Sequence, residues 1–304
     1  MSPQARGHLA MLTFSALVAG SFSLGSMIAN EIAPSALNAV RFAIAAVVIG
    51  IAALATTGLP RSAVQAPWRY LVLGGLFSTY FVLMFYGLQT APPVSAAAVF
   101  TLTPVVTALA GWVLLRQITT PRMALALTIG AVGALWVIFR ADWQMFRAFE
   151  IGRGEIIYFW GCVSHAIYTP MIRKLNRGEP AVVFTFWTQV AGCLLLIVFG
   201  WSDLMTTNWA ALPAIVWIGL IYISLFATAA SFVLVQFSSL RLPSAKVMAY
   251  TYLVPSWVIL WEIALGKAVP TGLILGGVAL TVIALLMLLK EETPPAVPAG
   301  TAAD

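Results

Sequence analysis

Charged side chains are scarce in this sequence. They make up 9% of its 304 residues, whereas a soluble domain carries about 25%. With 61% hydrophobic residues, the folded chain would have too little polar surface to face water. The basic residues are scattered through short links, so the net charge of +6 does not indicate a nucleic-acid partner. The composition therefore predicts an all-α integral membrane protein, surrounded by membrane lipid.

Cysteine and histidine are rare as well, with two residues of each. Cys162 and Cys193 fall inside apolar runs, which indicates neither a disulfide framework nor a metal site. There is no His/Asp cluster and no nucleophile beside a base in the sequence. We therefore expect no cofactor, no metal and no catalytic residue, which argues against a membrane-embedded enzyme. A structural or assembly protein without a solute site remains an alternative.

Long apolar runs, separated by short links with proline or glycine, predict ten membrane-spanning helices. We expect them at 8–28, 34–57, 68–90, 92–115, 121–140, 154–173, 181–200, 210–237, 243–264 and 270–289. The tail 290–304 is rich in proline and alanine and is expected to be disordered.

Basic residues in the links set the expected orientation, because cytoplasmic loops carry an excess of Lys and Arg. With the N-terminus in the cytoplasm, ten basic residues lie on the cytoplasmic side and four on the outer side. We therefore expect both termini in the cytoplasm and the chain in a bacterial-type inner membrane.

Proline spacing indicates an internal repeat. When the two halves are compared, Pro34 aligns with Pro180, Pro92 with Pro243, and Pro104 with Pro255. We therefore expect two five-helix repeats, 8–140 and 154–289. Since five is odd, the second repeat enters the membrane inverted. Inverted repeats are typical of secondary transporters, which bind their substrate near the bilayer midplane between the repeats.

The sequence resembles the EamA-type ten-span carriers of the drug/metabolite transporter superfamily. The resemblance covers residues 8–289 and is carried by Pro34 with Arg41, "TLTP" at 101–104, "TYLVP" at 251–255 and "SHAIYTPMIRK" at 164–174. It is greatest for YddG-like exporters of aromatic amino acids, and it implies export of hydrophobic amino acids from the cell. Two departures are Arg116 with Lys267, where many members carry a Gly-Glu pair, and His165, where related exporters often have Trp.

Charged residues inside the predicted spans are candidates for function, because they are costly in lipid. Lys246 can hold the carboxylate of a substrate, or its ammonium can reach the cytoplasmic surface. Arg41 is favoured as a structural or gating residue, with Asn38 one turn earlier sharing its hydrogen bonds. Glu262 lies near the outer end of its span and is read as a solvated residue rather than a proton carrier.

The remaining candidates are polar, aromatic and proline residues. His165 is read as a cavity residue, although a packing role stays open. Pro104 and Pro255 are predicted hinges that place a hollow between the repeats, unless their kinks only shape packing. Gly272 and Gly276 form a small-xxx-small pair expected to pack helices. The predicted substrate-binding set also includes Ser164, Tyr168, Trp160, Ser244, Tyr250, Thr251, Tyr80 and Phe100.

Together these features predict a carrier that exports a small, amino-acid-like solute by alternating access. Aromatic rings can line the walls for the solute side chain and bind its ammonium. Because no Asp or Glu lies in the middle of a span, we expect facilitated rather than proton-driven movement. Export of drugs or lipophilic cations is the alternative on the same scaffold.

Overall fold

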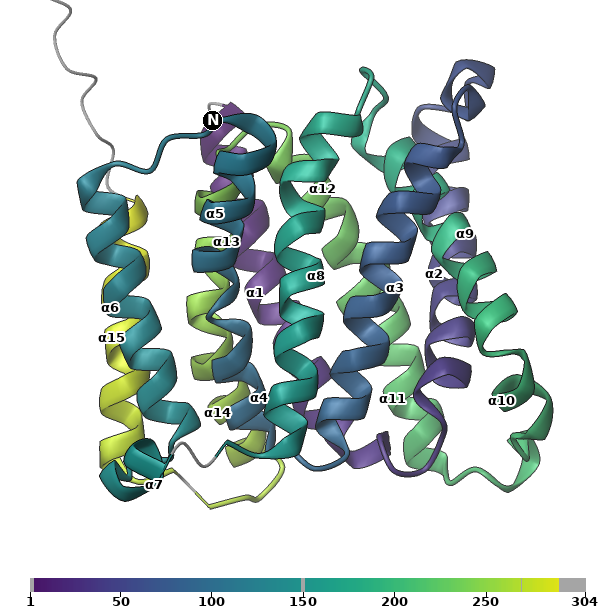
Figure 1. Cartoon of the computed structure of the whole chain (residues 1–304). Coiled ribbons are helices and arrows are strands. Elements are labelled where there is room, and N and C mark those ends of the chain that lie inside the picture. Colours follow the sequence, from purple (N-terminus) through teal and green to yellow (C-terminus); the bar gives the residue numbers. More distant parts are fainter. Residues whose placement is uncertain (1–2, 149–150, 269, 290–304) are drawn as a thin grey trace, which may run out of the picture.

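The computed structural model describes residues 3–148, 151–268 and 270–289, which form helices joined by short links (Figure 1). The predicted tail 290–304 lies outside the described residues. The first half contains α1 (Pro3–Ile28), α2 (Pro34–Thr56), η1 (Arg61–Val64), α3 (Trp68–Leu88), α4 (Pro93–Phe100), α5 (Thr103–Leu115), α6 (Pro121–Ile138) and the short α7 (Trp143–Ala148).

The second half begins with α8 (Arg153–Leu175) and ends with α15 (Gly272–Leu289). Between them lie α9 (Ala181–Phe199), α10 (Trp201–Thr206), η2 (Trp209–Ala211), α11 (Ala214–Ser224), the π-helix η3 (Leu225–Ala230), α12 (Ser231–Ser239), α13 (Ser244–Ala249), the 3-10 turn η4 (Tyr250–Leu253) and α14 (Val254–Ala264).

The long helices cross one common layer, as expected for a membrane protein (Figure 1). Within the described ranges, nine spans are long and apolar enough to cross a membrane. The tenth expected span corresponds to α8, which is 23 residues long and lies beside α3. Charged residues at both ends and the pair Ser164–His165 reduce its hydropathy. The prediction of an all-α membrane fold is confirmed.

Helix packing follows the predicted inverted repeat. The second span, α2, packs against its counterpart α9, and the fifth, α6, packs against its counterpart α15. Two further contacts occur in both repeats. The contact of α3 with α8 corresponds to that of α11 and α12 with α1. The contact of α5 with α8 corresponds to that of α14 with α1. Figure 1 shows α6 with α15 at one edge of the molecule and α2 with α9 at the other. These paired contacts relate the two five-helix repeats.

The fourth and ninth spans are both interrupted where proline was expected to break them. Residues 101–102 separate α4 from α5, and the 3-10 turn η4 separates α13 from α14. Pro104 and Pro255 each lie in the first turn of the helix that follows, where the missing N–H costs nothing. Because these spans run antiparallel, α4 packs against α14 and α5 against α13.

The small-residue contact of the last span differs from the expected one. A Cβ atom at Gly272 or Gly276 would meet no described atom within 4 Å, so the predicted pair makes no close contact with the described residues. Gly277 faces α6 instead, where a Cβ atom would lie 2.9 Å from the carbonyl oxygen of Gly133. The prediction was wrong by one residue, because an almost wholly apolar helix does not reveal which face packs inward.

One ion pair among the described residues ties α3 to the α8–α9 link. Arg69, which is almost fully buried, donates to Glu179 Oε1 at 2.6 Å and to the carbonyl oxygen of Leu175 at 2.7 Å. Burial raises the pKa of the Glu179 carboxyl, but hydrogen bonds from Arg69 and from the backbone N–H of Arg177 outweigh it and hold that pKa below its usual value. Glu179 therefore remains a carboxylate at neutral pH and neutralises Arg69.

Candidate functional site

A cluster of aromatic rings fills the middle of the molecule, where α1, α3, α4, α8 and α12 meet. Phe77 of α3 lies at its centre, with ring centroids 3.7 Å from Phe232, 4.7 Å from Phe81 and 4.8 Å from Tyr168. His165 joins the cluster with its ring centroid 4.5 Å from that of Tyr80. We call this set, with Phe22, Phe100 and Tyr158, the aromatic cluster.

A small cavity, here called the central cavity, lies inside the aromatic cluster. Its volume is about 10 Å³, which is close to the room needed for one water molecule. Ser21 and His165 line it with a buried hydroxyl and a buried Nδ1, neither of which has a hydrogen-bond partner in the described part of the chain. Its lining comprises Phe14, Val18, Ser21, Phe22, Phe77, Tyr80, Phe81, Met84, His165, Ala227 and Ser231. These residues come from α1, α3, α8 and the span of η3 and α12, which are two counterpart pairs of the repeat.

Four of the predicted substrate-binding residues belong to the aromatic cluster: His165, Tyr168, Tyr80 and Phe100. The hydroxyl of Tyr80 lies 3.1 Å from that of Tyr158. The hydroxyl of Tyr168 accepts a hydrogen bond of 3.0 Å from Gln236 Nε2. These bonds hold the rings in place, so the cluster has a fixed shape and few free polar groups.

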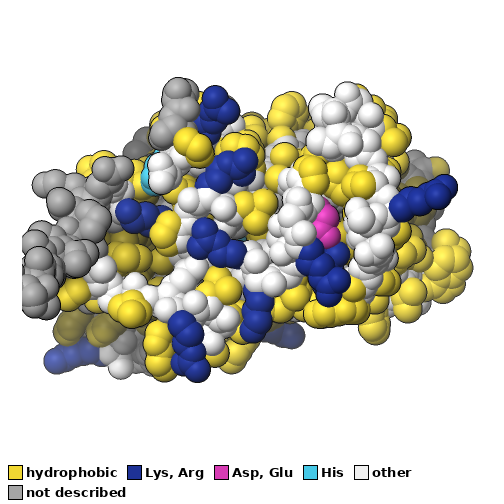
Figure 2. Space-filling model, turned by 90° about the horizontal axis from the view of Figure 1, so that it is seen from above, with side chains coloured by type: hydrophobic (Ala, Val, Ile, Leu, Met, Phe, Trp, Pro, Cys, Tyr) yellow, Lys and Arg dark blue, Asp and Glu magenta, His cyan; other side chains and the backbone are white. Residues whose placement is uncertain are grey.

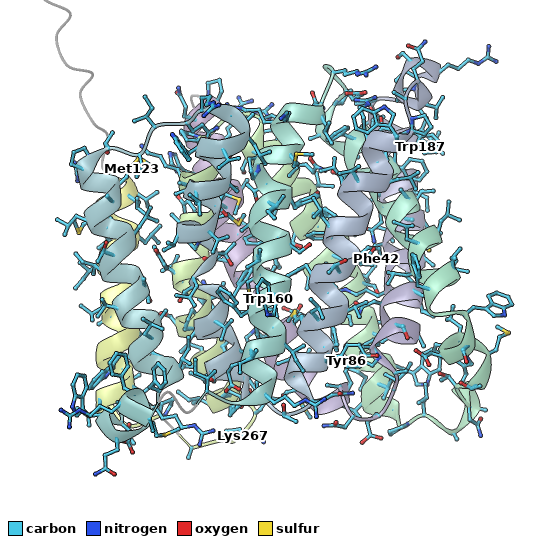
Figure 3. The ribbon with its side chains drawn as sticks, viewed as in Figure 1. Phe42, Tyr86, Met123, Trp160, Trp187 and Lys267 are labelled. Carbon is cyan, nitrogen blue, oxygen red and sulfur yellow. The ribbon has the colours of Figure 1, made fainter. Side chains whose placement is uncertain are left out.

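Two predicted residues on α8 do not join the cluster. The hydroxyl of Ser164 donates to the carbonyl oxygen of Leu76 at 2.7 Å, which ties α8 to α3. The side chain of Trp160 is 61% exposed on the molecular surface, beside an apolar cleft between α4, α6 and α8 (Figure 3). Trp160 therefore points outward from the helix bundle and does not line the central cavity.

A third group of predicted residues lies around α13, away from the central cavity. Lys246 is half-buried at the third position of α13, and the backbone N–H of Ser244 donates to Gln117 Oε1 at 3.3 Å. The hydroxyl of Tyr250 lies 3.1 Å from His8 Nδ1. The hydroxyl of Thr251 is buried, and no described residue pairs with it. None of them lines the central cavity.

Arg41 is buried in α2 and contacts the wall of the central cavity. Its Nε donates to the Thr228 hydroxyl at 2.5 Å, one terminal nitrogen to the carbonyl oxygen of Ala227 at 3.2 Å, and the other to Asn38 Oδ1 at 3.4 Å. The guanidinium carbon lies 3.6 Å from the centroid of the Phe81 ring. The expected sharing of hydrogen bonds with Asn38 is present, and the bonds to η3 link the two repeats.

The broken helices do not line the central cavity as expected. Pro104 and Pro255 are buried, so both breaks face the protein interior, but the lining contains no residue of α4, α5, α13, η4 or α14. The two broken spans pack on each other instead. Around the breaks, the hydroxyls of Thr107 and Tyr252 are buried and have no hydrogen-bond partner among the described residues.

Sequence reasoning missed Ser21 and Phe22 of α1, Phe77 and Phe81 of α3, and Phe232 of α12. No charge or breaker marks these positions. One signal was available: the repeat relates the first span to the sixth and the third to the eighth. His165 lies in the sixth span and Tyr80 in the third. Their counterparts in the repeat are the first and eighth spans, which contain Ser21, Phe22 and Phe232.

The fold defines the class: this is a multi-pass helical membrane protein built from two related five-helix repeats. The family model of the EamA-like transporters matches residues 5–139 and 152–290, one match in each repeat. The chain belongs to the EamA-like transporter family.

Its similar proteins agree with this class. An uncharacterised transporter of Bacillus subtilis, YyaM, is 25% identical over 274 residues, which cover 89% of this chain and 90% of YyaM. A second one from the same organism, YetK, is 21% identical over 308 residues, covering 98% and 91%. A crystal structure of a protein that is 20% identical matches with a TM-score of 0.73 over 94% of this chain and 97% of its own. That likeness supports the fold alone.

Proposed function

We propose that this transporter exports small hydrophobic or aromatic amino acids by alternating access, with the central cavity as the middle of its path. The observation that carries the proposal is the cavity itself. It lies between counterpart spans of the two repeats, its walls are rings, and it contains two buried polar groups without partners. Rings supply walls for an apolar side chain, and free polar groups orient a ligand.

The small volume of the central cavity fits a closed conformation in this mechanism. The rings of Phe77 and Phe232 are in contact, with centroids 3.7 Å apart and planes tilted by 35°. Side-chain rotation or movement of the repeats has to separate them before a solute enters. The breaks near Pro104 and Pro255 are the proposed hinges for that movement, since an interrupted helix can bend where its hydrogen bonds are missing.

The charge distribution supports an orientation with the N-terminus in the cytoplasm of a bacterial-type cell. Lys and Arg side chains are spread over the face on which the N-terminus lies (Figure 2). This excess is typical of a cytoplasmic face. The opposite face carries Glu31, Asp142, Asp203 and Glu262 together with four basic residues, Lys267 among them, so its net charge is much lower (Figure 3).

We also propose that movement is facilitative. In the described part of the chain, acidic side chains lie in links or near helix ends, and none lies in the middle of a span. Proton-driven transporters generally relay protons through acidic or histidine side chains within the membrane. His165 is the remaining candidate for such a role.

Purified protein in liposomes tests this proposal. We expect labelled phenylalanine or tryptophan to move down its gradient faster than in protein-free liposomes and to stop at equal concentrations. An imposed pH difference should not produce accumulation. Accumulation driven by the pH difference would contradict facilitative movement. Transport of lipophilic cations, without competition by phenylalanine or tryptophan, would contradict amino acids as the cargo.

A further inference from the structure

Arg41 carries a positive charge into the interior of the protein. It is the eighth residue of α2 and 0% exposed, and it lies about 10 Å along the helix from Pro34. Each of its three hydrogen-bond acceptors is uncharged: a hydroxyl, a carbonyl oxygen and a side-chain amide. The ring of Phe81 covers one side of the guanidinium.

No carboxylate neutralises Arg41 within residues 3–148, 151–268 and 270–289. The ion pair in these ranges is that of Arg69 with Glu179 at the basic face. A buried ion normally needs a counter-ion because burial removes its water. A guanidinium has five N–H groups, and three of them are used in the bonds described above. Donors therefore remain for an oxyanion.

The neighbours of Arg41 connect it to the central cavity. Phe81, on which it stacks, and Ala227, to which it donates, both line that cavity. In the same cavity the side chains of Ser21 and His165 are 2% and 1% exposed, and the Ser21 hydroxyl and His165 Nδ1 have no partner within the ranges given above. Unpaired buried polar groups in a cavity indicate a missing water or ligand.

We infer that Arg41 is the counter-ion for the carboxylate of the transported solute, which the central cavity takes up when the rings separate. Ser21 and His165 supply further polar contacts to the same solute. Because no acidic side chain lies in the middle of the described spans, an ammonium group on the solute has no charged partner there. The site therefore recognises small organic carboxylates with a flat apolar body, whether or not they carry an amino group, and rejects the corresponding amines.

This inference rests on the proposed function and specifies the part of the solute that is recognised. Lys246, the other cation predicted to act at the site, lies at the third position of α13 and does not line the cavity. Replacing Arg41 should change which probes bind, whereas replacing Lys246 should not. Lys246 therefore provides a matched control.

Thermal shifts of the purified full chain in detergent test the inference with three probes: 3-phenylpropionate, phenylalanine and phenethylamine. We expect 3-phenylpropionate, the acid, to stabilise the protein at concentrations no higher than those that phenylalanine requires. Phenethylamine, the amine, should require an about tenfold higher concentration or have no effect. Arg41→Gln should weaken binding of 3-phenylpropionate about tenfold or more, so that the protein no longer binds the acid more tightly than the amine. Lys246→Gln should leave the order of the three probes unchanged.

Arg41→Lys is included because Arg41→Gln can fail to fold. It keeps the charge but loses the paired donors of the guanidinium, so it should bind the acid more weakly and still prefer it to the amine. Equal binding of acid and amine to the unaltered protein, or loss of the preference in Lys246→Gln but not in Arg41→Gln, would overturn the inference while leaving transport intact. If none of the probes binds or moves in liposomes, the proposed function fails together with it.

Discussion

Phe77→Ala is expected to destabilise the folded protein by about 3–5 kcal/mol, as is typical when a buried phenylalanine is truncated. Phe77 is 4% exposed, and its ring contacts rings from α2, α8 and α12 as well as from its own helix. Its removal leaves a void where the two repeats meet. The free energy of unfolding in detergent, measured by denaturant titration, checks this value.

The same variant is expected to weaken closure of the path, so that solute should leak through liposomes more quickly than with the unaltered protein. Phe199→Ala serves as the control, because Phe199 is 85% exposed to the lipid side. It should change neither stability nor leak. A Phe77→Ala protein as stable as the control would show that the aromatic cluster does not hold the repeats together.

Gly74→Ala is expected to destabilise the protein by about 3 kcal/mol or more, at the upper end of overpacking effects. A Cβ atom at Gly74 would lie 2.5 Å from the backbone nitrogen of Gly192 and 2.9 Å from the carbonyl oxygen of Thr188. These are backbone atoms of α9, so the clash cannot be relieved by turning a side chain. The two helices must move apart, which also disturbs the aromatic cluster on α3.

The adjacent glycine provides the matched control for this prediction. A Cβ atom at Gly75 would meet Leu195 at 3.6 Å, an ordinary contact distance. Gly75→Ala should therefore leave stability unchanged or raise it slightly, since alanine favours a helix over glycine by about 0.5–1 kcal/mol. Equal unfolding free energies for Gly74→Ala and Gly75→Ala would contradict the close packing of α3 on α9.

The positions of the spans were predictable because membrane helices are specified by length, hydropathy and breakers. Prolines ended the runs at Pro34, Pro121 and Pro243, and helices begin at or directly after each of them. The interruptions near Pro104 and Pro255 followed from the same chemistry. The inverted arrangement followed from counting five spans per repeat.

The candidate site was less predictable, because apolar periodicity does not distinguish protein-facing from lipid-facing sides in a membrane. Trp160 and His165 lie on the same helix and were both proposed as site residues, yet Trp160 is 61% exposed and His165 is 1% exposed. The prediction of which glycine packs against a neighbouring helix was wrong for the same reason, since Gly277 and not Gly276 contacts α6. Phe77 and Phe232 carry no charge or breaker that marks them, and their proximity arises from tertiary packing.

Alternating access through the central cavity is the central claim, and cysteine labelling tests it most directly. Ser21→Cys, in a background with Cys162→Ala and Cys193→Ala, places one thiol in the cavity wall. A charged, membrane-impermeant thiol reagent is then added to either side of oriented vesicles, with Thr79→Cys, exposed on the lipid side, as the control. We predict labelling of Ser21→Cys from each side and of Thr79→Cys from neither. Labelling of Ser21→Cys from neither side, or from one side alone, would contradict the claim.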